Sequence, residues 1–156
     1  MSRKARAFWP VLFVLLVSDC TSKRAAELML APVGVPHEVV GDVVRFQLAY
    51  NEGAATGLDV GRHSRVVFSV MAVFAVLVLA RLYRQAARDD WRLGLAIALI
   101  IGGALGNLLD RLRSPLGVVD FIDVGVGGAR FWIFNVADVG VTLGAGLLAA
   151  LLWRRG

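Results

Sequence analysis

Four long apolar stretches, separated by polar segments, set the pattern of the chain. A helix needs about 20 mostly apolar residues to cross the hydrocarbon core of a bilayer. Three of the stretches approach or reach that length with their flanks, and the first reaches it if its helix continues to about residue 30. The pattern therefore predicts four transmembrane helices, over about residues 7–30, 65–83, 92–112 and 133–153.

A shorter alternation predicts a sheet between the first two helices. In the stretch DVVRFQLAY, the large apolar side chains of Phe46, Leu48 and Tyr50 occupy every second position. That spacing is typical of a half-buried strand. We therefore expect a small sheet over about residues 38–60, within a single integral membrane domain that takes up residues 1–156.

Composition supports a membrane protein and excludes several kinds of site. The chain is 58% hydrophobic, with a mean hydropathy of +0.69, whereas typical domains are roughly 45–50% apolar with glycine counted in. Its single cysteine excludes an intramolecular disulfide. The two histidines, His37 and His63, lie in one non-helical region and form no Cys/His cluster, so we expect no zinc site, no other metal and no cofactor.

The distribution of charge predicts the topology. Nine of the 17 Lys and Arg residues and two acids lie in the first six residues, in residues 81–92 and at the C-terminal tail, which gives these segments a charge of +7. The rest of the chain then carries −2, because the total is +5. The positive-inside rule therefore predicts that both termini are cytoplasmic and that residues 31–64 and 114–131 lie outside. We attribute the basic balance to topology and expect no nucleic-acid partner.

The start of the chain allows a second interpretation, a lipoprotein signal peptide, because basic residues and an apolar run precede Cys20. Two features exclude it: Asp19 stands where the cleaving enzyme requires a small residue, and three more membrane spans follow. We interpret this segment as a helix that stays in the membrane. Asp19 and Lys23 are four residues apart, so we expect them to form an ion pair on one helix face. A charge at that depth is costly unless it is paired.

Other costly polar residues come from four segments, yet the predicted topology puts all of them near the outer leaflet. They are Asn51 after the strand, Asn107, Asp110 and Arg111 at the end of the third helix, Asp120 and Asp123 in the next connection, and Asn135 and Asp138 at the start of the fourth helix. The inner half of the membrane has no comparable group. A polar cluster at one depth indicates a functional site.

The cluster offers carboxylates, amides and cations, but no histidine and no serine or cysteine beside a base. Two close carboxyl groups can hydrolyse a peptide bond, since one remains protonated as an acid while the other activates water as a base. Residue chemistry alone leaves the pair open among Asp110, Asp120, Asp123 and Asp138. We expect Asp110 to hold neighbouring backbone, Asp120 to lie in a loop, and Asp123 to be solvated or in a turn.

Asp138 is the acid for which a purely structural role is hardest to find, because it interrupts an apolar helix. Asn135 lies three residues before it on the same face and can orient its carboxylate. Gly102, Gly103 and Gly106 are explained by close helix packing.

Two alternative functions remain. The first is an ion pathway, which the apolar inner half of the membrane disfavours. The second is a structural membrane protein, which leaves Asp120 and Asp138 without a role.

Together, five motifs resemble those of bacterial lipoprotein signal peptidase, also called signal peptidase II, a family of aspartic proteases of the inner membrane. In chain order they are SDCTSK, LAYNEGAATG, GGALGNLLDR, VVDFIDV and FNVADVG. The resemblance covers nearly the whole chain. It implies an all-α membrane protein with four transmembrane helices, both termini cytoplasmic, and a small extracytoplasmic β-sheet cradle.

The resemblance further implies that Asp120 and Asp138 are the catalytic dyad. It implies substrate-binding or dyad-supporting roles for Asp19, Lys23, Asn51, Gly53, Asn107, Asp110, Arg111, Asn135 and Ala137. The implied substrate is a prolipoprotein bearing diacylglyceryl-cysteine, which is cut before that cysteine at the periplasmic face of the inner membrane. We expect the enzyme to act as a monomer among membrane lipids.

The chain departs from the family pattern at a few positions. Cys20 stands where glutamine is usual, Thr56 stands where an aromatic residue is usual, and GARFWIFN is a variant of the segment before the last helix. These changes affect expected substrate contacts rather than the acids, so they bear on lipid or sequence preference more than on the reaction.

Overall fold

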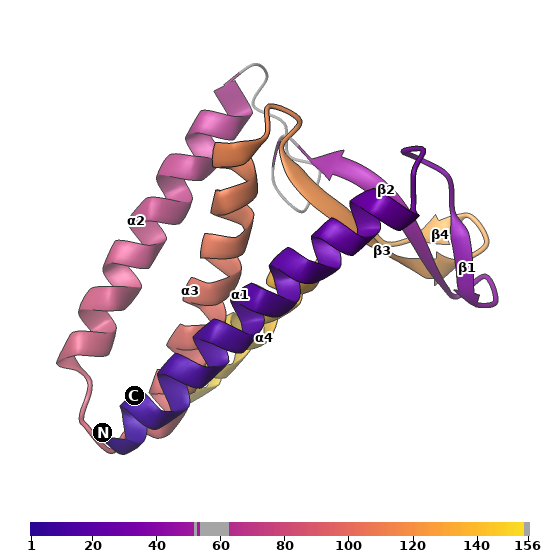
Figure 1. Ribbon diagram of the computed structural model, residues 1–156. Coiled ribbons are helices and arrows are strands. Elements are labelled where there is room, and N and C mark those ends of the chain that lie inside the picture. The colour runs from indigo at the N-terminus through magenta and orange to yellow at the C-terminus, as the bar shows by residue number, and fades with distance from the viewer. Residues whose placement is uncertain (52, 54–62, 155–156) are drawn as a thin grey trace.

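A computed structural model describes residues 1–51, 53 and 63–154 of the chain (Figure 1). Four helices carry most of these residues: α1 (Arg3–Met29), α2 (Ser64–Gln85), α3 (Trp91–Arg113) and α4 (Val136–Trp153). Each is long and apolar enough to cross a membrane. The four spans predicted from the hydropathy pattern are therefore present as helices, with bounds that differ by a few residues.

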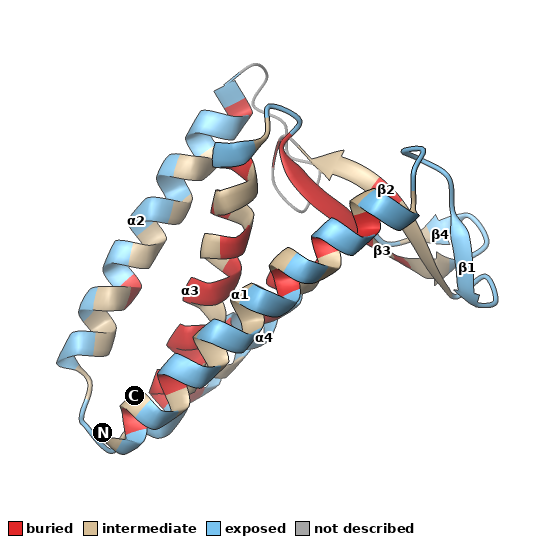
Figure 2. Ribbon diagram, viewed as in Figure 1, coloured by how far each residue is buried: buried red, intermediate tan, exposed pale blue. Residues whose placement is uncertain are grey.

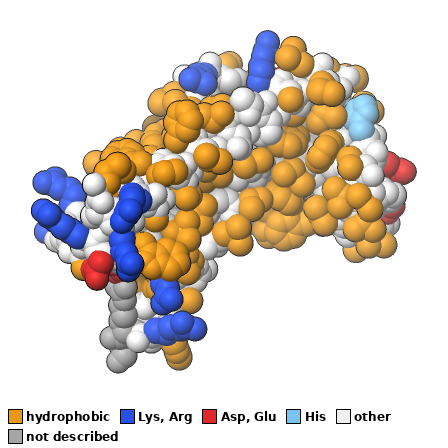
Figure 3. All heavy atoms as spheres, turned by 60° about the horizontal axis from the view of Figure 1, so that its bottom comes forward, with side chains coloured by type: hydrophobic (Ala, Val, Ile, Leu, Met, Phe, Trp, Pro, Cys, Tyr) orange, Lys and Arg blue, Asp and Glu red, His pale blue; other side chains and the backbone are white. Residues whose placement is uncertain are grey.

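The two ends of the molecule differ in chemistry. Both termini lie at one end of the helices, and the sheet lies at the other end (Figure 1). Lys and Arg side chains gather at the end that carries the termini, while hydrophobic side chains cover the long flank between that end and the sheet (Figure 3). This division matches a helical bundle whose flank faces lipid and whose ends face water.

Helix α3 lies at the centre of the bundle. It packs against α1, α2 and α4, and it carries more buried residues than any other described helix (Figure 2). Ile97 and Ala96 are fully enclosed and join Phe8 of α1 and Leu151 of α4 in one apolar core. Helix α2, by contrast, packs against α3 and exposes most of its surface.

The four-stranded sheet is antiparallel throughout, in the order β1 (His37–Val40), β2 (Val44–Asn51), β3 (Val118–Val126) and β4 (Ala129–Arg130). The strand predicted around Phe46 is present as β2, but in β2 only Leu48 is fully buried. The register between β2 and β3 shifts between Phe46 and Ala49, which interrupts a simple inside–outside alternation.

Strand β3 corrects two expectations about the connection between α3 and α4. Asp120 lies in this strand, opposite Ala49 of β2, and not in a loop. Asp123 is neither solvated nor in a turn, since only 2% of its surface is exposed. Both acids are tolerated inside a strand because partners from distant segments satisfy them, and a local hydropathy pattern cannot reveal such partners.

Candidate active site

The site begins with the way the sequence starts α4. Asn135 is the N-cap residue of this helix, and its side chain accepts a hydrogen bond from the backbone N–H of Asp138 over 3.0 Å. Asp138 returns the interaction, because its Oδ2 accepts from the backbone N–H of Asn135 over 3.2 Å. This reciprocal capping box satisfies two otherwise free N–H groups and fixes the Asp138 carboxylate at the helix start. The predicted contact between Asn135 and the Asp138 carboxylate is thus present.

The second carboxylate comes from the sheet. Asp120 has 2% of its surface exposed, and two asparagine side chains donate hydrogen bonds to it. The Nδ2 group of Asn51, at the end of β2, lies 3.0 Å from Oδ2, and the Nδ2 group of Asn135 lies 2.6 Å from Oδ1. Asn135 therefore contacts both carboxylates: its side-chain Nδ2 donates to Asp120, and its backbone N–H donates to Asp138.

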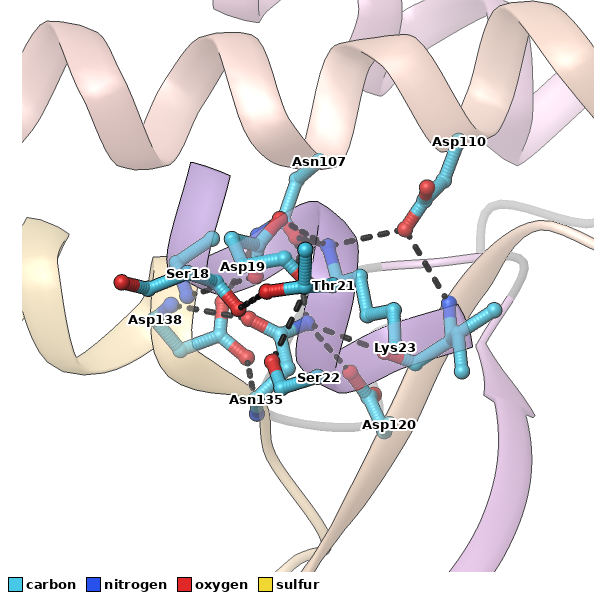
Figure 4. Close-up of polar contacts among 12 residues, drawn as sticks. Ser18, Asp19, Thr21, Ser22, Lys23, Asn107, Asp110, Asp120, Asn135 and Asp138 are labelled. Carbon is cyan, nitrogen blue, oxygen red and sulfur yellow. Dashed lines mark hydrogen bonds and ion pairs between the residues drawn. The ribbon is translucent and has the colours of Figure 1, made fainter. Parts of the chain in front are cut away.

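Asn107 of α3 gives a second link to Asp138. Its Nδ2 group donates to Asp138 Oδ1 over 2.8 Å, while its Oδ1 accepts from Asn135 Nδ2 over 3.1 Å. The close-up in Figure 4 shows these side chains gathered between α1, α3, α4 and the sheet. The three amides of Asn51, Asn107 and Asn135 and the two carboxylates thus form one continuous hydrogen-bonded network.

Burial changes the acidity of Asp120. Loss of water around the carboxylate raises the pKa of Asp120 to about 7 from its ordinary value of 3.8. The hydrogen bond from Asn51 opposes the increase, the negative charge of Asp138 adds to it, and Asn135 and Lys23 lower the pKa again. The result is a carboxyl group that holds a proton at a pH where an ordinary aspartate is ionised.

A buried lysine organises the other side of the network. The Nζ of Lys23 lies 2.7 Å from Asp19, 2.8 Å from Asp110 and 2.9 Å from Asn107 Oδ1. Its three donors therefore meet three acceptors, as a buried ammonium requires. The predicted Asp19–Lys23 pair is confirmed, and Lys23 also joins α1 to α3.

The two acids that bind Lys23 position the segments that carry the dyad candidates. Asp19 Oδ1 accepts from the backbone N–H of Ala137 over 2.9 Å, next to Asp138. Asp110 Oδ2 accepts from the backbone N–H of Val119 over 3.3 Å, next to Asp120. The expectation that Asp110 holds neighbouring backbone is confirmed.

Arg111 connects α3 to the segment that follows β2. One of its nitrogens donates to the backbone oxygen of Gly53 over 2.8 Å, and another donates to that of Asn107 over 3.3 Å. Gly53 in turn donates from its backbone N–H to Asn51 Oδ1 over 2.9 Å. This chain of contacts ends at the side chain that donates to Asp120.

The structure brings all eleven predicted site residues into one connected network through these contacts. Cys20, one of the departures from the family pattern, lines a cavity of about 310 Å³ with Lys23 and Asp110. Thr56, the other, lies outside the described residues. Asp123 lies outside the network.

Sequence reasoning missed an ionic cluster in the sheet that surrounds Asp123. Arg45 of β2 and Arg130 of β4 approach its carboxylate to 2.9 and 2.7 Å. Burial alone would raise the pKa of Asp123, but the two arginines outweigh it and hold the pKa below its ordinary range. The cluster ties three strands together. The available signal was a charge on each of three successive strands, but their register was not known.

The chemical capacity of the site follows from its two linked carboxyl groups. Asp120 is buried and holds a proton near neutral pH, and Asp138, at the amino end of α4, belongs to the same hydrogen-bonded network. Two carboxyl groups in different protonation states can supply a general acid and a general base. The geometry therefore suits hydrolysis by an activated water molecule.

Comparisons with known sequences agree with each other. The family model described as signal peptidase (SPase) II matches residues 11–154. A lipoprotein signal peptidase of Pseudomonas fluorescens is 42% identical over 158 residues, which cover 98% of this chain and 91% of that protein. One of Halothermothrix orenii is 37% identical over 146 residues, which cover 93% of each chain.

Solved structures show the same fold. A bacterial membrane enzyme determined by the in meso method at 2.3 Å resolution superimposes with a TM-score of 0.82 and 28% identity, covering 92% of this chain and 85% of its own. A second such enzyme, at 1.9 Å resolution, gives a TM-score of 0.79 and 29% identity over 91% of this chain and 89% of its own. The helices and the sheet therefore recur together in related membrane enzymes.

Proposed function

The chain belongs to the signal peptidase II family, and from this we propose that it removes signal peptides from prolipoproteins whose cysteine carries a diacylglyceryl group. Cleavage would fall just before that cysteine, with Asp120 and Asp138 as the catalytic dyad. The observation that carries the proposal is the shared contact of both acids with Asn135. It joins two carboxyl groups that are 18 positions apart in the sequence.

The two acids would take different roles. Asp120 would be the proton-bearing member, because burial raises its pKa to about 7. Asp138 would be the ionised member, since it is only half-buried and caps the amino end of α4. Asn135 and Asn107 would hold its carboxylate in place through the hydrogen bonds already described.

The reaction follows from these roles. Asp138 takes a proton from water, and the oxygen of that water attacks the carbonyl carbon before the lipid-bearing cysteine. Asp120 gives its proton to the carbonyl oxygen, which produces a neutral diol intermediate. The carbon–nitrogen bond then breaks as Asp138 passes its proton to the leaving nitrogen. One diol hydroxyl returns a proton to Asp120, and a free signal peptide and a lipid-bearing amine remain.

The surrounding residues would position this dyad without touching the scissile bond. Lys23 and Asp19 would fix Ala137, Asp110 would fix Val119, and Arg111 would fix Gly53. The site needs no metal in this mechanism, because the carboxyl groups supply both proton transfers. A chelator should therefore leave the rate unchanged.

We further propose that the sheet end faces the periplasm and that the protein resides as a monomer in the bacterial inner membrane. The concentration of cations at the opposite end supports this orientation (Figure 3). In that orientation the dyad candidates lie at the junction of the helices and the sheet, where water can reach a bond held near the membrane surface. A lipid-modified substrate would approach sideways through the bilayer.

Substitution of each acid by its amide tests the dyad. Asp120→Asn and Asp138→Asn should each reduce release of the signal peptide by about a hundredfold to ten-thousandfold, because one proton transfer is lost. Release is measured with purified protein in detergent, using diacylglyceryl-modified and unmodified prolipoprotein. Only the modified form should be cut.

Glu38→Gln provides the matched control, because Glu38 is an exposed acid on β1 outside the network. It should keep the full rate, and circular dichroism should show that all three variants retain their helices. The dyad assignment is falsified if both active-site variants cleave at the normal rate. Equal cleavage of modified and unmodified substrate would instead overturn the lipid requirement.

A further inference from the structure

An apolar groove of about 440 Å³ extends from Asp138 along the exposed flank of α4. Trp132 and Phe134, in the segment before the helix, form one wall, and Val139 and Leu143 of α4 form the other. Leu143 is 60% exposed and Val139 is 39% exposed, so this part of α4 is not covered by another described element. The groove is continuous with the candidate active site, because Asp138 is one of the residues that line it.

The direction of the groove is set by the helix. Helix α4 starts at Val136 next to the sheet and ends at Trp153, at the end that carries the termini. Leu143 therefore lies about 6 Å deeper in the bundle than Val139, at roughly 1.5 Å per residue. In the orientation proposed above, the groove leads from Asp138 near the membrane surface toward the hydrocarbon.

The lining fits a hydrocarbon ligand better than a peptide. Besides Asp138, the only polar side chain among the described residues that line it is Thr142. A helical signal-peptide segment is roughly 10–12 Å wide with its side chains. One turn of such a helix would already fill a volume close to that of the groove. An extended acyl chain is far narrower and needs no hydrogen-bonding partner.

On the basis of the proposed function, we propose that this groove binds one acyl chain of the diacylglyceryl group while the dyad cuts the adjacent peptide bond. The lipid is joined to the cysteine directly after the scissile bond, so only a short run of single bonds separates the acyl chain from the carboxylates. A chain that leaves Asp138 toward the hydrocarbon would pass between Trp132 and Leu143. Filling or widening the groove should therefore change lipid preference.

Photochemical labelling tests where the chain lies. A prolipoprotein peptide with a diazirine in one acyl chain is illuminated with the Asp120→Asn variant in phospholipid nanodiscs, and briefly with the wild-type protein. Mass spectrometry should find the label in residues 131–134 and 139–143. A phospholipid that carries the same diazirine should label these residues much less.

Two results would overturn the assignment. Equal labelling by the phospholipid would mean that the groove holds bulk membrane lipid. Substrate label concentrated on Met29 and Phe46 would place the chain instead in the second apolar cavity, of about 270 Å³, between α1 and the sheet.

Opposite substitutions at Leu143 provide a kinetic test. Leu143→Trp fills the groove and should lower kcat/KM for a straight-chain substrate about tenfold, mainly through KM. Leu143→Ala widens the groove and should raise the rate for a methyl-branched chain relative to a straight one. Leu77→Trp is the matched control, because Leu77 is 64% exposed on α2 and lines neither the groove nor the second apolar cavity. It should change neither kcat/KM for the straight-chain substrate nor the ratio of the rates for branched and straight chains.

The outcomes separate this inference from the proposed function. If the Leu143 variants cleave both lipids in the wild-type ratio, the acyl-chain site is wrong and the protease assignment stands. If wild-type protein releases no signal peptide from any lipid-modified substrate, the proposed function itself fails.

Discussion

Asn135 combines two roles that are usually separate. Its side chain caps α4 and also donates to Asp120, so the start of the helix and the acidity of the buried acid depend on one amide. Asp138 likewise serves as a partner in the capping box, and this explains part of its presence in an apolar helix. The structural and the proposed catalytic roles of these residues are therefore not alternatives.

The raised pKa of Asp120 predicts a pH dependence. In the proposed mechanism Asp120 must hold a proton, and it loses that proton as the pH rises through about 7. We expect kcat/KM for the modified substrate to fall above that pH, by about tenfold per unit in the limiting case. The measurement is a pH profile in detergent with enzyme stability checked at each pH. A rate that stays flat to pH 9 would show that Asp120 acts in its ionised form.

The buried ammonium group of Lys23 should be important for the stability of the protein. Lys23→Met leaves Asp19, which is fully buried, without its cation. Breaking a buried pair costs about 3–5 kcal/mol, so we expect a large loss of stability in thermal unfolding. Adding Asp19→Asn should restore part of it, because the unpaired charge is then removed.

Arg24→Met is the control for this test. Arg24 is the next residue, its side chain is 67% exposed, and it pairs with Glu27 on the helix surface. Such a pair contributes about 0–1 kcal/mol, so the unfolding temperature should hardly change. A similar loss in both variants would contradict the buried-pair interpretation.

At the scale of elements, glycines let α3 approach its neighbours. A Cβ at Gly103 would collide with the backbone oxygen of Ala137, and one at Gly106 would lie 2.5 Å from Asp19 Oδ2. The close-packing role predicted for these glycines is therefore confirmed. Their small size brings the start of α4 and the buried acid of α1 against the centre of α3, where the candidate site is built.

Gly103→Ala should therefore destabilise the protein by about 1–3 kcal/mol, since backbone must move to admit the methyl group. It should also lower activity, because the displaced residue adjoins Asp138. Thermal unfolding and signal-peptide release measure the two effects.

Gly146→Ala on α4 is the matched control. A Cβ there meets nothing within 4 Å, so the change should leave activity intact and stabilise the helix by up to about 1 kcal/mol. Loss of stability in both variants would indicate that the close contact at Gly103 is not the cause.

For the whole molecule, the separation of charge from one end to the other predicts its orientation. With Cys20 replaced by serine, Glu38→Cys and Ala87→Cys each provide one exposed cysteine, in β1 and in the connection between α2 and α3. An impermeant maleimide added to spheroplasts should label the Glu38→Cys variant. It should label the Ala87→Cys variant only after permeabilisation. The reverse pattern would invert the proposed topology.

The sequence by itself determined the helices, one strand and the residues of the candidate site. Hydropathy fixes helices in a membrane because each helix satisfies its own backbone hydrogen bonds, so α1 to α4 depend on local composition. Polar residues in apolar helices, such as Asp19 and Asp138, are costly and therefore stand out without coordinates. The spacing of Asn135 and Asp138, three residues apart, also predicts their local contact.

Only the tertiary structure decided how these residues combine. Strand β3 was missed because strand pairing depends on a distant partner, β2, and the partners that satisfy Asp120 and Asp123 lie on other segments. The choice of Asp120 over Asp123 as the acid that adjoins Asp138 rests on which of them meets Asn135. The pKa of Asp120 likewise depends on burial, which no local pattern records. Local interactions therefore determine the helices of this protein, whereas long-range contacts determine how the residues of the candidate site are arranged.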